Sequence, residues 1–535
     1  MIIKRRFLLS CFILLFLLVG LQAAHSQQSS AGKLEQTLEL IKYYYVDTIN
    51  EKKIVDDAMR VMMKDLDPHS VYIPAEEMRE MNEPLVGKFE GIGIQFNILN
   101  DTIMVTATIV GGPSEKLGIR AGDRIVKIEG QNVASIKITN NDVLKKLRGA
   151  KGTKVTVGIS RRSVSDLLEF TITRDQIPLF SVDATYMIAP GIGYIKISRF
   201  ADSTVEEFKK ALEKLKAMGI TSLVLDLSDN GGGYLNRAYE LADEFLTEGK
   251  KIVYTRGRRS VPEDYYSTST GGWEKGKLVV LINESSASAS EIVSGAIQDW
   301  DRGLLIGRRS FGKGLVQKPY PLSDGSMLRL TVAHYFTPSG RCIQKPYGAD
   351  GNDDDYELDI SNRLKHGEFT NADSIHFNDT TKYYTNSKRL VYGGGGIMPD
   401  IFVPIDTSMN SNYFYELLRK NCFNEYTLTY VDNNRSKLKR EFADISIFRS
   451  NFVLDEKTYD DFIAYAEKQG VKKDLVGLKT SDKLIKLELR ALIARNIWDT
   501  DAFFEVMNEI NPFVSKAIEA IQSNTFEKLK IAVTK

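Results

Sequence analysis

Apolar positions near the start of the chain recur at the spacing of a helix. They predict helical structure over residues 33–65, because residues three and four positions apart share one helix face. The positions concerned are Leu34, Leu38, Ile41, Ile54, Ala58, Val61 and Met62. Pro68 disfavours helix in the residue before it and so ends this region. A short second helix is predicted over about residues 74–82, and we place an N-terminal helical region over residues 27–86.

From Gly87 onward, short apolar and alternating runs are separated by glycines, a pattern typical of strands and turns. Strands are predicted over residues 89–96, 103–110, 154–160 and 168–173, with a turn at 111–114, a short strand within 117–130 and a helix near 141–148. A stretch of roughly 90 residues is long enough to fold as a compact module. We therefore expect a separate small domain over residues 87–176.

Strands and helices alternate in the next part of the chain. Strands are predicted over residues 193–197, 222–227 and 277–282, with helices over 204–218, from about 236, and up to Trp300. This order favours a largely parallel sheet with binding loops at the strand ends. We expect a core domain over residues 177–405, interrupted by a polar insertion at about 348–388, and a charged helical region over 406–535.

The first residues have the layout of a secretory signal peptide. A positive segment, Lys4 to Arg6, precedes an apolar run over residues 7–21, and small residues follow at Ala23, Ala24 and Ser26. This order of charge, apolar run and small residues is typical of an exported precursor. We predict a signal over residues 1–26, and export to the periplasm or cell envelope of a bacterium. An uncleaved membrane anchor is the alternative, although the run is short for a span of about 20 residues.

Charge and cysteine content exclude several other classes of protein. The chain has 71 Lys and Arg against 70 Asp and Glu, so neither nucleic acid nor a strongly anionic surface is an expected partner. After the signal, the only cysteines are Cys342 and Cys422, too few for a disulfide framework. The histidines are scattered and no CxxC or HExxH occurs. We predict no metal and no cofactor.

A run of small residues, Ser285 to Ser290, lies between a predicted buried strand and a predicted helix, with Glu291 directly after it. A serine at such a position is exposed at the strand end, and the free amides of the helix start can stabilise an oxyanion. The alternative is an ordinary helix cap, since Ser followed by Glu is common at helix starts. The segment alone favours the cap.

The stretch from Gly307 to Gly314 nearly matches a nucleotide-binding loop. Gly314 stands where that loop needs a hydroxyl, and a strand follows where a helix is required. We therefore reject nucleotide binding. Lys313 lies between Phe311 and apolar Leu315, and burial can lower the pKa of a lysine from about 10.4 far enough for it to act as a base. A solvated lysine in a turn is the alternative.

Two further segments fit a Ser-Lys site. Gln317 is four residues beyond Lys313, about 13 Å away along a straight strand, so a contact between them needs a bend. A neutral amide suits an orienting partner of an amine. The loop from Asp229 to Gly233 follows another predicted strand, and its amides could complete an oxyanion hole with the amide of Ala289. A plain flexible turn is the alternative.

Together these segments resemble the carboxy-terminal processing peptidases, or tail-specific proteases, of serine peptidase family S41. The family pattern is matched by residues 286–291 and by residues 311–317. The resemblance implies Ser288 as nucleophile, Lys313 as base and Gln317 as its positioning partner. It also implies an oxyanion hole from Ala289 and from Gly232 or Gly233. The 25-residue separation between Ser288 and Lys313 agrees with the family's arrangement and selects Ser288 among the serines.

The resemblance extends over roughly residues 34–405. It includes Tyr44 to Asp47, Leu66 to Ser70, Gly112 to Ser114, Gly118 to Ile125, Tyr335 to Pro346 and Gly393 to Asp400. It implies a multidomain α+β protein in which an α/β peptidase core, like that of crotonase and ClpP, carries an inserted-type PDZ domain and helical N- and C-terminal regions. One departure is the loop at residues 226–233, where Ser228 and Gly231 replace the family's common Arg and Pro. This departure concerns how rigidly the loop is preformed.

The residues Gly91-Ile92-Gly93-Ile94 resemble the carboxylate-binding loop of a PDZ domain. In that role backbone amides hold a chain terminus and the next strand accepts the peptide as an added strand. The resemblance thus implies peptide substrates with apolar C-termini. We expect an exported serine endopeptidase that recognises such tails through the PDZ domain and cuts with a Ser-Lys dyad. The alternatives are an inactive PDZ-containing adaptor and a ligand-binding core of related fold. An adaptor protein of the envelope is left open as a second partner.

Overall fold

The computed structural model describes residues 29–99, 101–109, 111–162, 164–347, 356–376 and 381–532. The predicted signal peptide over residues 1–26 therefore lies outside the described residues. Contacts divide the chain into a short unit that ends at Leu66 and a large unit from Asp67 onward.

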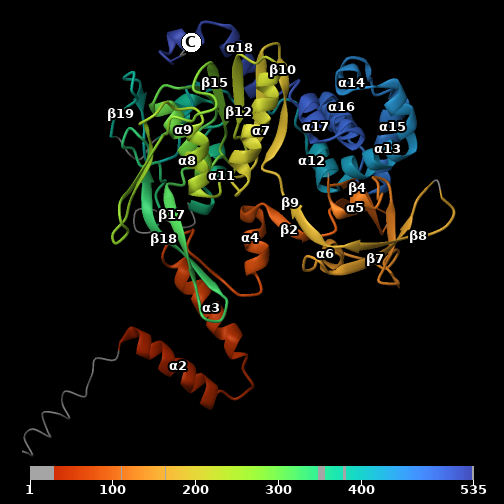
Figure 1. Cartoon of the computed structure of the whole chain (residues 1–535), viewed down its shortest axis with the longest axis horizontal. Coiled ribbons are helices and arrows are strands. Elements are labelled where there is room, and N and C mark those ends of the chain that lie inside the picture. Colours follow the sequence, from red (N-terminus) through yellow and green to blue (C-terminus); the bar gives the residue numbers. More distant parts are fainter. Residues whose placement is uncertain are drawn as a thin grey trace, which may run out of the picture. The chain divides into compact units, whose positions relative to one another are not determined.

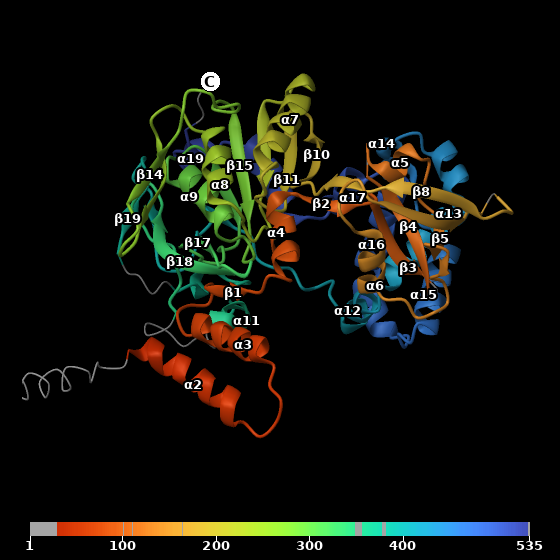
Figure 2. The same ribbon diagram turned by 60° about the horizontal axis from the view of Figure 1, so that its bottom comes forward.

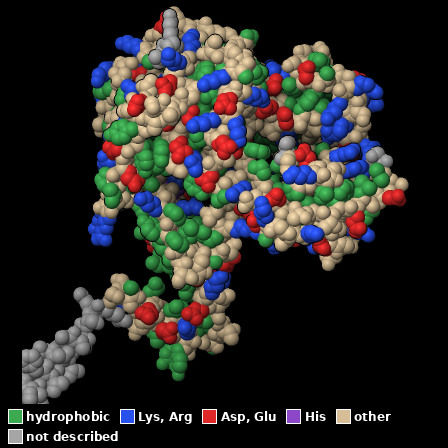
Figure 3. Space-filling model, viewed as in Figure 1, with side chains coloured by type: hydrophobic (Ala, Val, Ile, Leu, Met, Phe, Trp, Pro, Cys, Tyr) green, Lys and Arg blue, Asp and Glu red, His purple; other side chains and the backbone are tan. Residues whose placement is uncertain are grey.

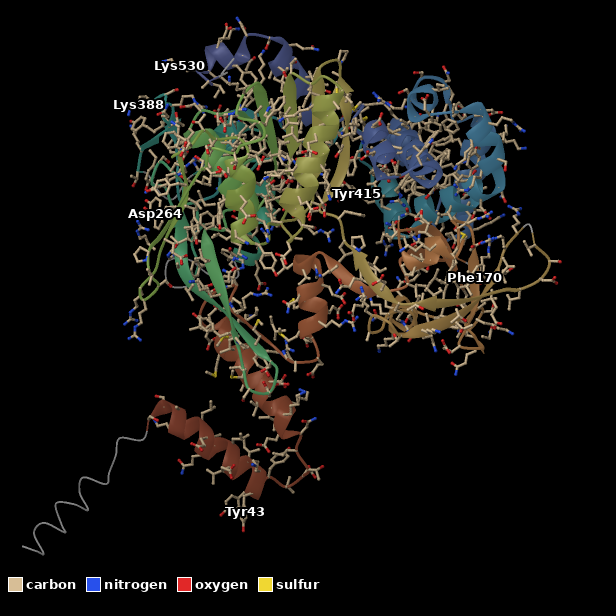
Figure 4. All side chains as sticks on the ribbon, viewed as in Figure 1. Tyr43, Phe170, Asp264, Lys388, Tyr415 and Lys530 are labelled. Atoms are coloured by element: carbon tan, nitrogen blue, oxygen red, sulfur yellow. The ribbon has the colours of Figure 1, made fainter. Side chains whose placement is uncertain are left out.

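Among its described residues, from position 29 onward, the short unit contains two helices instead of one continuous helix. Helix α2 spans Ser30–Tyr44 and helix α3 spans Glu51–Lys64. The side chain of Ser29 accepts from the Gly32 amide and caps α2, and the Asn50 side chain accepts from the Lys53 amide and caps α3. A capping side chain satisfies a backbone donor that the helix leaves free, so the break between the helices follows from Asn50. Tyr43 near the end of α2 is labelled in Figure 4.

A six-stranded sheet forms the centre of the large unit, in the order β10-β11-β12-β15-β16-β21. The strands are β10 (Val182–Ala189), β11 (Ile192–Ile197), β12 (Ser222–Asp226), β15 (Lys277–Ile282), β16 (Leu304–Gly307) and β21 (Ile401–Phe402). All neighbouring pairs from β11 to β21 are parallel, and β10 is antiparallel to β11. The strands are apolar at nearly every position because helices cover both faces of the sheet.

Helices α7 (Thr204–Ala217), α8 (Leu235–Asp243) and α9 (Ala289–Asp299) cover one face of this sheet, and α18 (Pro512–Gln522) packs on the other. Figure 1 shows the first three in front of β12 and β15. Successive residues of a strand point to opposite faces. Accordingly, Leu225 belongs to the core beneath α7 to α9, whereas Val224 belongs to the core beneath α18.

A second, antiparallel sheet is built around the long strand β18. It contains β1 (Val71–Ile73), β13 (Lys251–Arg256), β14 (Glu263–Tyr266), β17 (Leu315–Pro321) and β18 (Met327–Phe336). β17 and β18 form a hairpin, and β1 pairs with the first part of β18. Figures 1 and 2 both show the hairpin as one long ribbon. This sheet brings the turn before β1 next to β18, the partner of the strand that follows Lys313.

The small domain leaves and rejoins the rest of the large unit through a two-stranded ribbon of β2 (Lys88–Gly91) and β9 (Asp175–Pro178). Its own sheet has the order β3-β4-β5-β7-β8, with β6 beside β5. The elements are β3 (Ile94–Leu99), β4 (Thr102–Thr108), α5 (Pro113–Lys116), β5 (Arg124–Ile128), β6 (Gln131–Asn132), α6 (Asn140–Leu147), β7 (Lys154–Ser160) and β8 (Leu168–Thr173). Phe170 of β8, labelled in Figure 4, packs against the core of this domain.

The prediction of one strand over residues 89–96 was wrong. Residues 89–91 belong to β2 and residues 94–96 to β3, which lie in different sheets. The break falls at Gly93, whose φ of +74° is a backbone conformation that glycine adopts without strain. An apolar run cannot reveal this break, because both halves satisfy the same strand pattern.

The polar stretch at about 348–388 contains, among its described residues, α11 (Asp359–Lys365), a short 3₁₀ helix (Ala372–Ser374) and β19 (Tyr383–Tyr384), which pairs with β20 (Leu390–Val391).

The C-terminal region is helical. It contains α12 (Asn412–Arg419), α13 (Cys422–Glu441), α14 (Ile445–Asn451), α15 (Glu456–Lys468), α16 (Leu475–Ile497), α17 (Thr500–Met507), α18 and α19 (Thr525–Lys528). Helices α12 to α17 share an apolar core of their own.

No helix in the described part of the chain combines the length and the apolar character that crossing a bilayer requires. On the face shown in Figure 3, Lys and Arg side chains alternate with Asp and Glu side chains over the large unit and do not gather in one patch. This distribution matches the near-zero formal net charge of +1.

Phe208 of α7 provides a test of the central core. Its ring is fully buried and packs edge to face on Phe245, 5.4 Å between ring centroids. We predict that Phe208→Ala lowers the free energy of unfolding by about 3–5 kcal/mol, since it removes a buried ring and leaves a cavity. Urea denaturation followed by circular dichroism measures this. The control Met218→Ala truncates a side chain that is 52% exposed, and should change stability by less than about 0.5 kcal/mol.

Candidate active site

The three candidate segments follow neighbouring parallel strands of the central sheet. The loop with Gly232 and Gly233 follows β12, the segment with Ser288 follows β15, and the segment with Lys313 follows β16. These strands lie side by side and run in the same direction. Their carboxyl ends therefore meet at one edge of the sheet, which is where open α/β sheets bind ligands. The sheet order thus brings together residues that are far apart in the sequence.

Ser288 occupies the junction between β15 and α9, directly before the first helical residue, Ala289. Its backbone has φ 54° and ψ −109°, a conformation that a residue with a side chain rarely adopts. Backbone strain of this kind costs about 1–3 kcal/mol and persists only where the surroundings impose it. An ordinary helix cap has extended backbone and needs no strain. Ser288 also forms a capping box with Glu291, but capping alone does not require the strained backbone, and the role of Ser288 as nucleophile stays a prediction.

The buried carboxylate of Glu291 joins the serine segment to the lysine segment. One of its oxygens, Oε2, accepts from the amides of Ser288 at 2.7 Å and Lys313 at 2.9 Å. The other, Oε1, accepts from the Ser310 hydroxyl at 2.6 Å and the Gly312 amide at 2.7 Å. Burial raises the pKa of Glu291, and these hydrogen bonds oppose that rise. One side chain in the first turn of α9 thus fixes the backbone on both sides of the site.

Tyr335 of β18 provides a second link between the same two residues. Its fully buried hydroxyl lies 2.6 Å from the Lys313 carbonyl oxygen and 3.0 Å from the Ser288 carbonyl oxygen. In addition, the Phe311 amide donates to the Ser286 carbonyl at 3.0 Å. Ser288 and Lys313 are therefore held close together through their backbones by groups from three different elements.

Lys313 is partly buried and has no ion pair within the described residues. Burial is the main cause that lowers its pKa below the ordinary 10.5, and the nearby cation of Arg329 adds to this. The flanking glycines are needed for space. A Cβ on Gly314 would lie 2.9 Å from the Gln344 backbone nitrogen, and Gly312 has φ +92°, with an added Cβ 3.1 Å from the Gly396 nitrogen. A lowered pKa increases the fraction of Lys313 whose amine is neutral, and only the neutral amine can accept a proton.

Gln317 does not contact Lys313 through a hydrogen bond in the described residues. Its amide nitrogen instead donates to the Thr331 hydroxyl at 3.3 Å. The bend expected from the glycines is present at Gly312, and a β-bulge between Val316 and Gln317 changes the pairing with β18. Bulges re-aim side chains next to active sites. The role of Gln317 as partner of Lys313 stays a prediction.

The predicted oxyanion residues lie on the serine side of the site. A Cβ on Gly232 would be 2.8 Å from Ser288 Cβ and 3.0 Å from the Ala289 nitrogen, so these backbones nearly touch. The Gly232 amide donates to the Asn230 side chain at 2.9 Å. In contrast, the amides of Gly233 and Ala289 have no acceptor within the described residues. These two are the free donors beside Ser288, and the oxyanion hole itself stays a prediction.

The four residues of the predicted carboxylate loop connect β2 to β3. Gly91 ends β2, Ile92 is buried, Gly93 makes the left-handed turn, and Ile94 begins β3. β3 is the edge strand of its sheet. Ile94 also lines a cavity of about 450 Å³. Its other apolar walls come from Phe89, Ile109, Pro178, Leu179, Phe180 and Val182.

Several residues of the site escaped the sequence analysis. Thr331 lies in a strand that the sequence pattern did not single out, and Tyr335 was noted only as part of a resemblance. Arg363 lies in the stretch taken as a polar insertion, yet it is buried and donates to the carbonyls of Arg309 and Ser310, directly before the lysine segment. Asp67 was noted only as part of a resemblance. No local pattern marks these residues, because the contacts that bring them to the site join positions 14 to 264 residues apart.

Four segments of the chain match models of protein families. Residues 191–358 match the model of peptidase family S41, and residues 104–161 match the PDZ domain. Residues 19–77 match the N-terminal domain of the activating protease CtpB. Residues 413–499 match a family of unknown function. The two expected domain types, S41 and PDZ, are thereby confirmed.

Among curated proteins, the chain is 38% identical over 311 residues to a carboxy-terminal-processing protease of Bartonella bacilliformis, covering 57% of this chain and 70% of that protein. It is 36% identical over 328 residues to the carboxy-terminal processing protease CtpB of Bacillus subtilis, covering 61% and 68%. Among solved structures, the photosystem II D1 C-terminal processing protease is 26% identical, with a TM-score of 0.37 over 70% of this chain and 87% of that one. The resemblance and the expected fold class are confirmed.

The four hydrogen bonds of Glu291 lead to a test of the site. A glutamine at this position must turn its NH₂ group toward two buried donors, whichever way its amide is oriented. Each unpaired buried donor costs about 1–3 kcal/mol. We predict that Glu291→Gln lowers the melting temperature by several degrees, about 4 °C or more, as measured by calorimetry. The control Glu206→Gln changes an exposed residue paired with Lys210, and a melting temperature equal in both variants would contradict the prediction.

Proposed function

The chain belongs to peptidase family S41, the serine peptidases that include the carboxy-terminal processing proteases, and on this premise we propose that it is an exported endopeptidase with a dyad of Ser288 and Lys313. The observation that carries the proposal is the shared anchoring of these two residues. Glu291 and Tyr335 each contact both of their backbones. Such anchoring preorganises a nucleophile and its base without using the reacting groups.

In the proposed reaction, the Ser288 oxygen attacks the carbonyl carbon of the scissile peptide bond and its proton moves to the neutral Lys313 amine. The C–N bond then breaks, Lys313 passes the proton to the leaving amine, and Ser288 carries the acyl group. Water attacks the acyl carbon and gives a proton to Lys313. The bond from that carbon to the Ser288 oxygen then breaks, Lys313 returns the proton to this oxygen, and the acid is released. The amides of Ala289 and Gly233, which have no acceptor among the described residues, would bind the oxyanion, with Gly232 positioning the loop against Ser288.

The small domain is proposed to recognise the substrate. β3 is a sheet edge that can accept an extended peptide as an added strand, and Gly91 to Ile94 lie at its start to hold the terminal carboxylate. One side of the cavity beside Ile94 is apolar, including Phe89 and Phe180, and suits an apolar tail, whereas the other side is polar, with Gln95, Asp183, Arg199, Asp499, Thr500 and Asp501. We also propose that the segment over residues 1–26 directs export to the periplasm or cell envelope.

Turnover of an unstructured protein with an apolar C-terminus tests the dyad. Wild type should cleave it, whereas Ser288→Ala and Lys313→Ala should each lower kcat by at least about a thousandfold, since dyad members act as a unit. Cleavage by Ser288→Ala at the wild-type rate would falsify the proposal.

A second substrate that differs only in three terminal aspartates should lose about tenfold or more in kcat/KM. Equal turnover of both substrates would contradict the proposal that the enzyme recognises an apolar C-terminal tail.

The charges around Lys313 predict a pH effect. Because the base must be neutral, activity should rise with pH as Lys313 loses its proton, below the ordinary lysine value. The cation of Arg329 lowers the pKa of Lys313, so Arg329→Gln should raise that pKa and move the acid limb of the kcat/KM profile to higher pH. The control Arg256→Gln removes a cation that pairs with Asp264 on β14 (Figure 4) and should leave the limb in place. A shift to lower pH in Arg329→Gln contradicts the assignment of the base.

A further inference from the structure

The turn before β1 packs against the strand that carries Thr331. Asp67 Oδ1 accepts from the amides of His69 at 2.8 Å and Ser70 at 2.9 Å, and Oδ2 accepts from the Ser70 hydroxyl at 2.5 Å. An aspartate that bonds the backbone two and three residues ahead makes a local turn. The pairing of β1 with β18 then brings this turn to Thr331, whose amide donates to the Ser70 hydroxyl at 3.1 Å.

The carboxylate of Asp67 fixes the direction of the next two hydrogen bonds. The Thr331 hydroxyl donates to Asp67 Oδ1 at 3.0 Å, and an ionised carboxylate has no proton to give in return. The single hydroxyl proton of Thr331 is therefore used, and its oxygen can only accept from Gln317. The Gln317 amide must present its NH₂ end to Thr331 at 3.3 Å.

An amide with its NH₂ end fixed has its oxygen fixed as well. A glutamine without a fixed partner can turn over and exchange its donor and acceptor ends. Here the charge of Asp67, which is only 8% exposed, is transmitted through Thr331 and selects one orientation. The bulge between Val316 and Gln317 sets the position from which the side chain leaves the strand.

We propose that Asp67 and Thr331 are positioning residues for the base, because they hold the Gln317 amide so that its oxygen, and not its nitrogen, faces the Lys313 amine. This proposal rests on the proposed function. Gln317 makes no hydrogen bond to the amine among the described residues, but an oxygen in that place can accept an N–H once the ammonium forms, and it leaves the lone pair of neutral Lys313 free for the Ser288 proton. An NH₂ group in the same place would donate to that lone pair and block the base.

The charges near Lys313 decide which variant tests orientation alone. Arg329 on β18 lowers the pKa of Lys313, whereas Glu291 on α9 and Asp67 raise it. His69 contributes no charge near neutral pH, because burial and the Lys313 cation lower its pKa to about 4. Changing Asp67 would therefore alter both charge and orientation. Thr331→Val removes the hydroxyl that links Gln317 to Asp67 and changes no charge.

The experiment compares the full-length chain with Thr331→Val, Thr331→Ser and Gln317→Ala, and adds the double variant Thr331→Val with Gln317→Ala. Thr331→Val should lower the kcat plateau by about tenfold or more, with KM changed less than about twofold. Its acid limb should move to lower pH, since the ammonium loses an accepting oxygen. Thr331→Ser keeps the hydroxyl and should resemble wild type.

The double variant separates positioning from a purely structural role. If Thr331 acts through Gln317, Thr331→Val should cause no further loss in the Gln317→Ala background. A wild-type plateau and limb in Thr331→Val, or a full additional loss in the double variant, overturns the proposal. Thr331→Ala, which also lacks the hydroxyl, replaces Thr331→Val if calorimetry shows that the valine variant is unfolded. A chain whose Ser288→Ala variant stays active refutes the dyad instead, so the two failures are distinguishable.

Discussion

The buried carboxylate of Glu291 is the constraint on which the site depends. It lies in the first turn of α9, fully enclosed, and accepts four hydrogen bonds from the segments that follow β15 and β16. A buried charge is tolerated only when its hydrogen-bonding capacity is filled, so the carboxylate and the two segments fix one another. Removing any of these donors would leave the remaining charge less well compensated.

This arrangement explains how an acid and a basic amine lie in the same small region without forming an ion pair. Glu291 bonds the backbone amide of Lys313, not its ammonium group. Backbone dipoles therefore compensate the carboxylate, while the amine is left to burial and to the repulsion of Arg329, and both lower its pKa. A direct ion pair would have stabilised the protonated lysine and opposed its use as a base. The hydrogen bonds of Glu291 thus serve the geometry of the site and keep the amine available.

The site is also supported by segments distant in the sequence. The turn at Asp67 reaches Thr331 and Gln317, and Arg363 of the polar stretch donates to the carbonyls just before the lysine segment. Each of these contacts uses a buried or partly buried polar group that is satisfied by a partner more than ten residues away. Networks of this kind specify one arrangement, since a partly satisfied network is costly. The polar stretch at about 348–388 therefore takes part in shaping the site.

The amino-acid sequence by itself determined the elements and the chemically capable residues. The run at Ser285 to Ser290, the glycines around Lys313 and the alternation of strands and helices are local patterns, and they depend on periodicity and turn chemistry that a single segment carries. The sequence also marked Gln317, but it could not show that the amide bonds Thr331, and it predicted one strand where Gly93 separates two. Only the tertiary structure decided these points, together with the roles of Glu291 and Tyr335 as shared anchors. The physical reason is that such contacts depend on strand order and burial, which bring together residues whose separation along the chain contains no information about their distance in space.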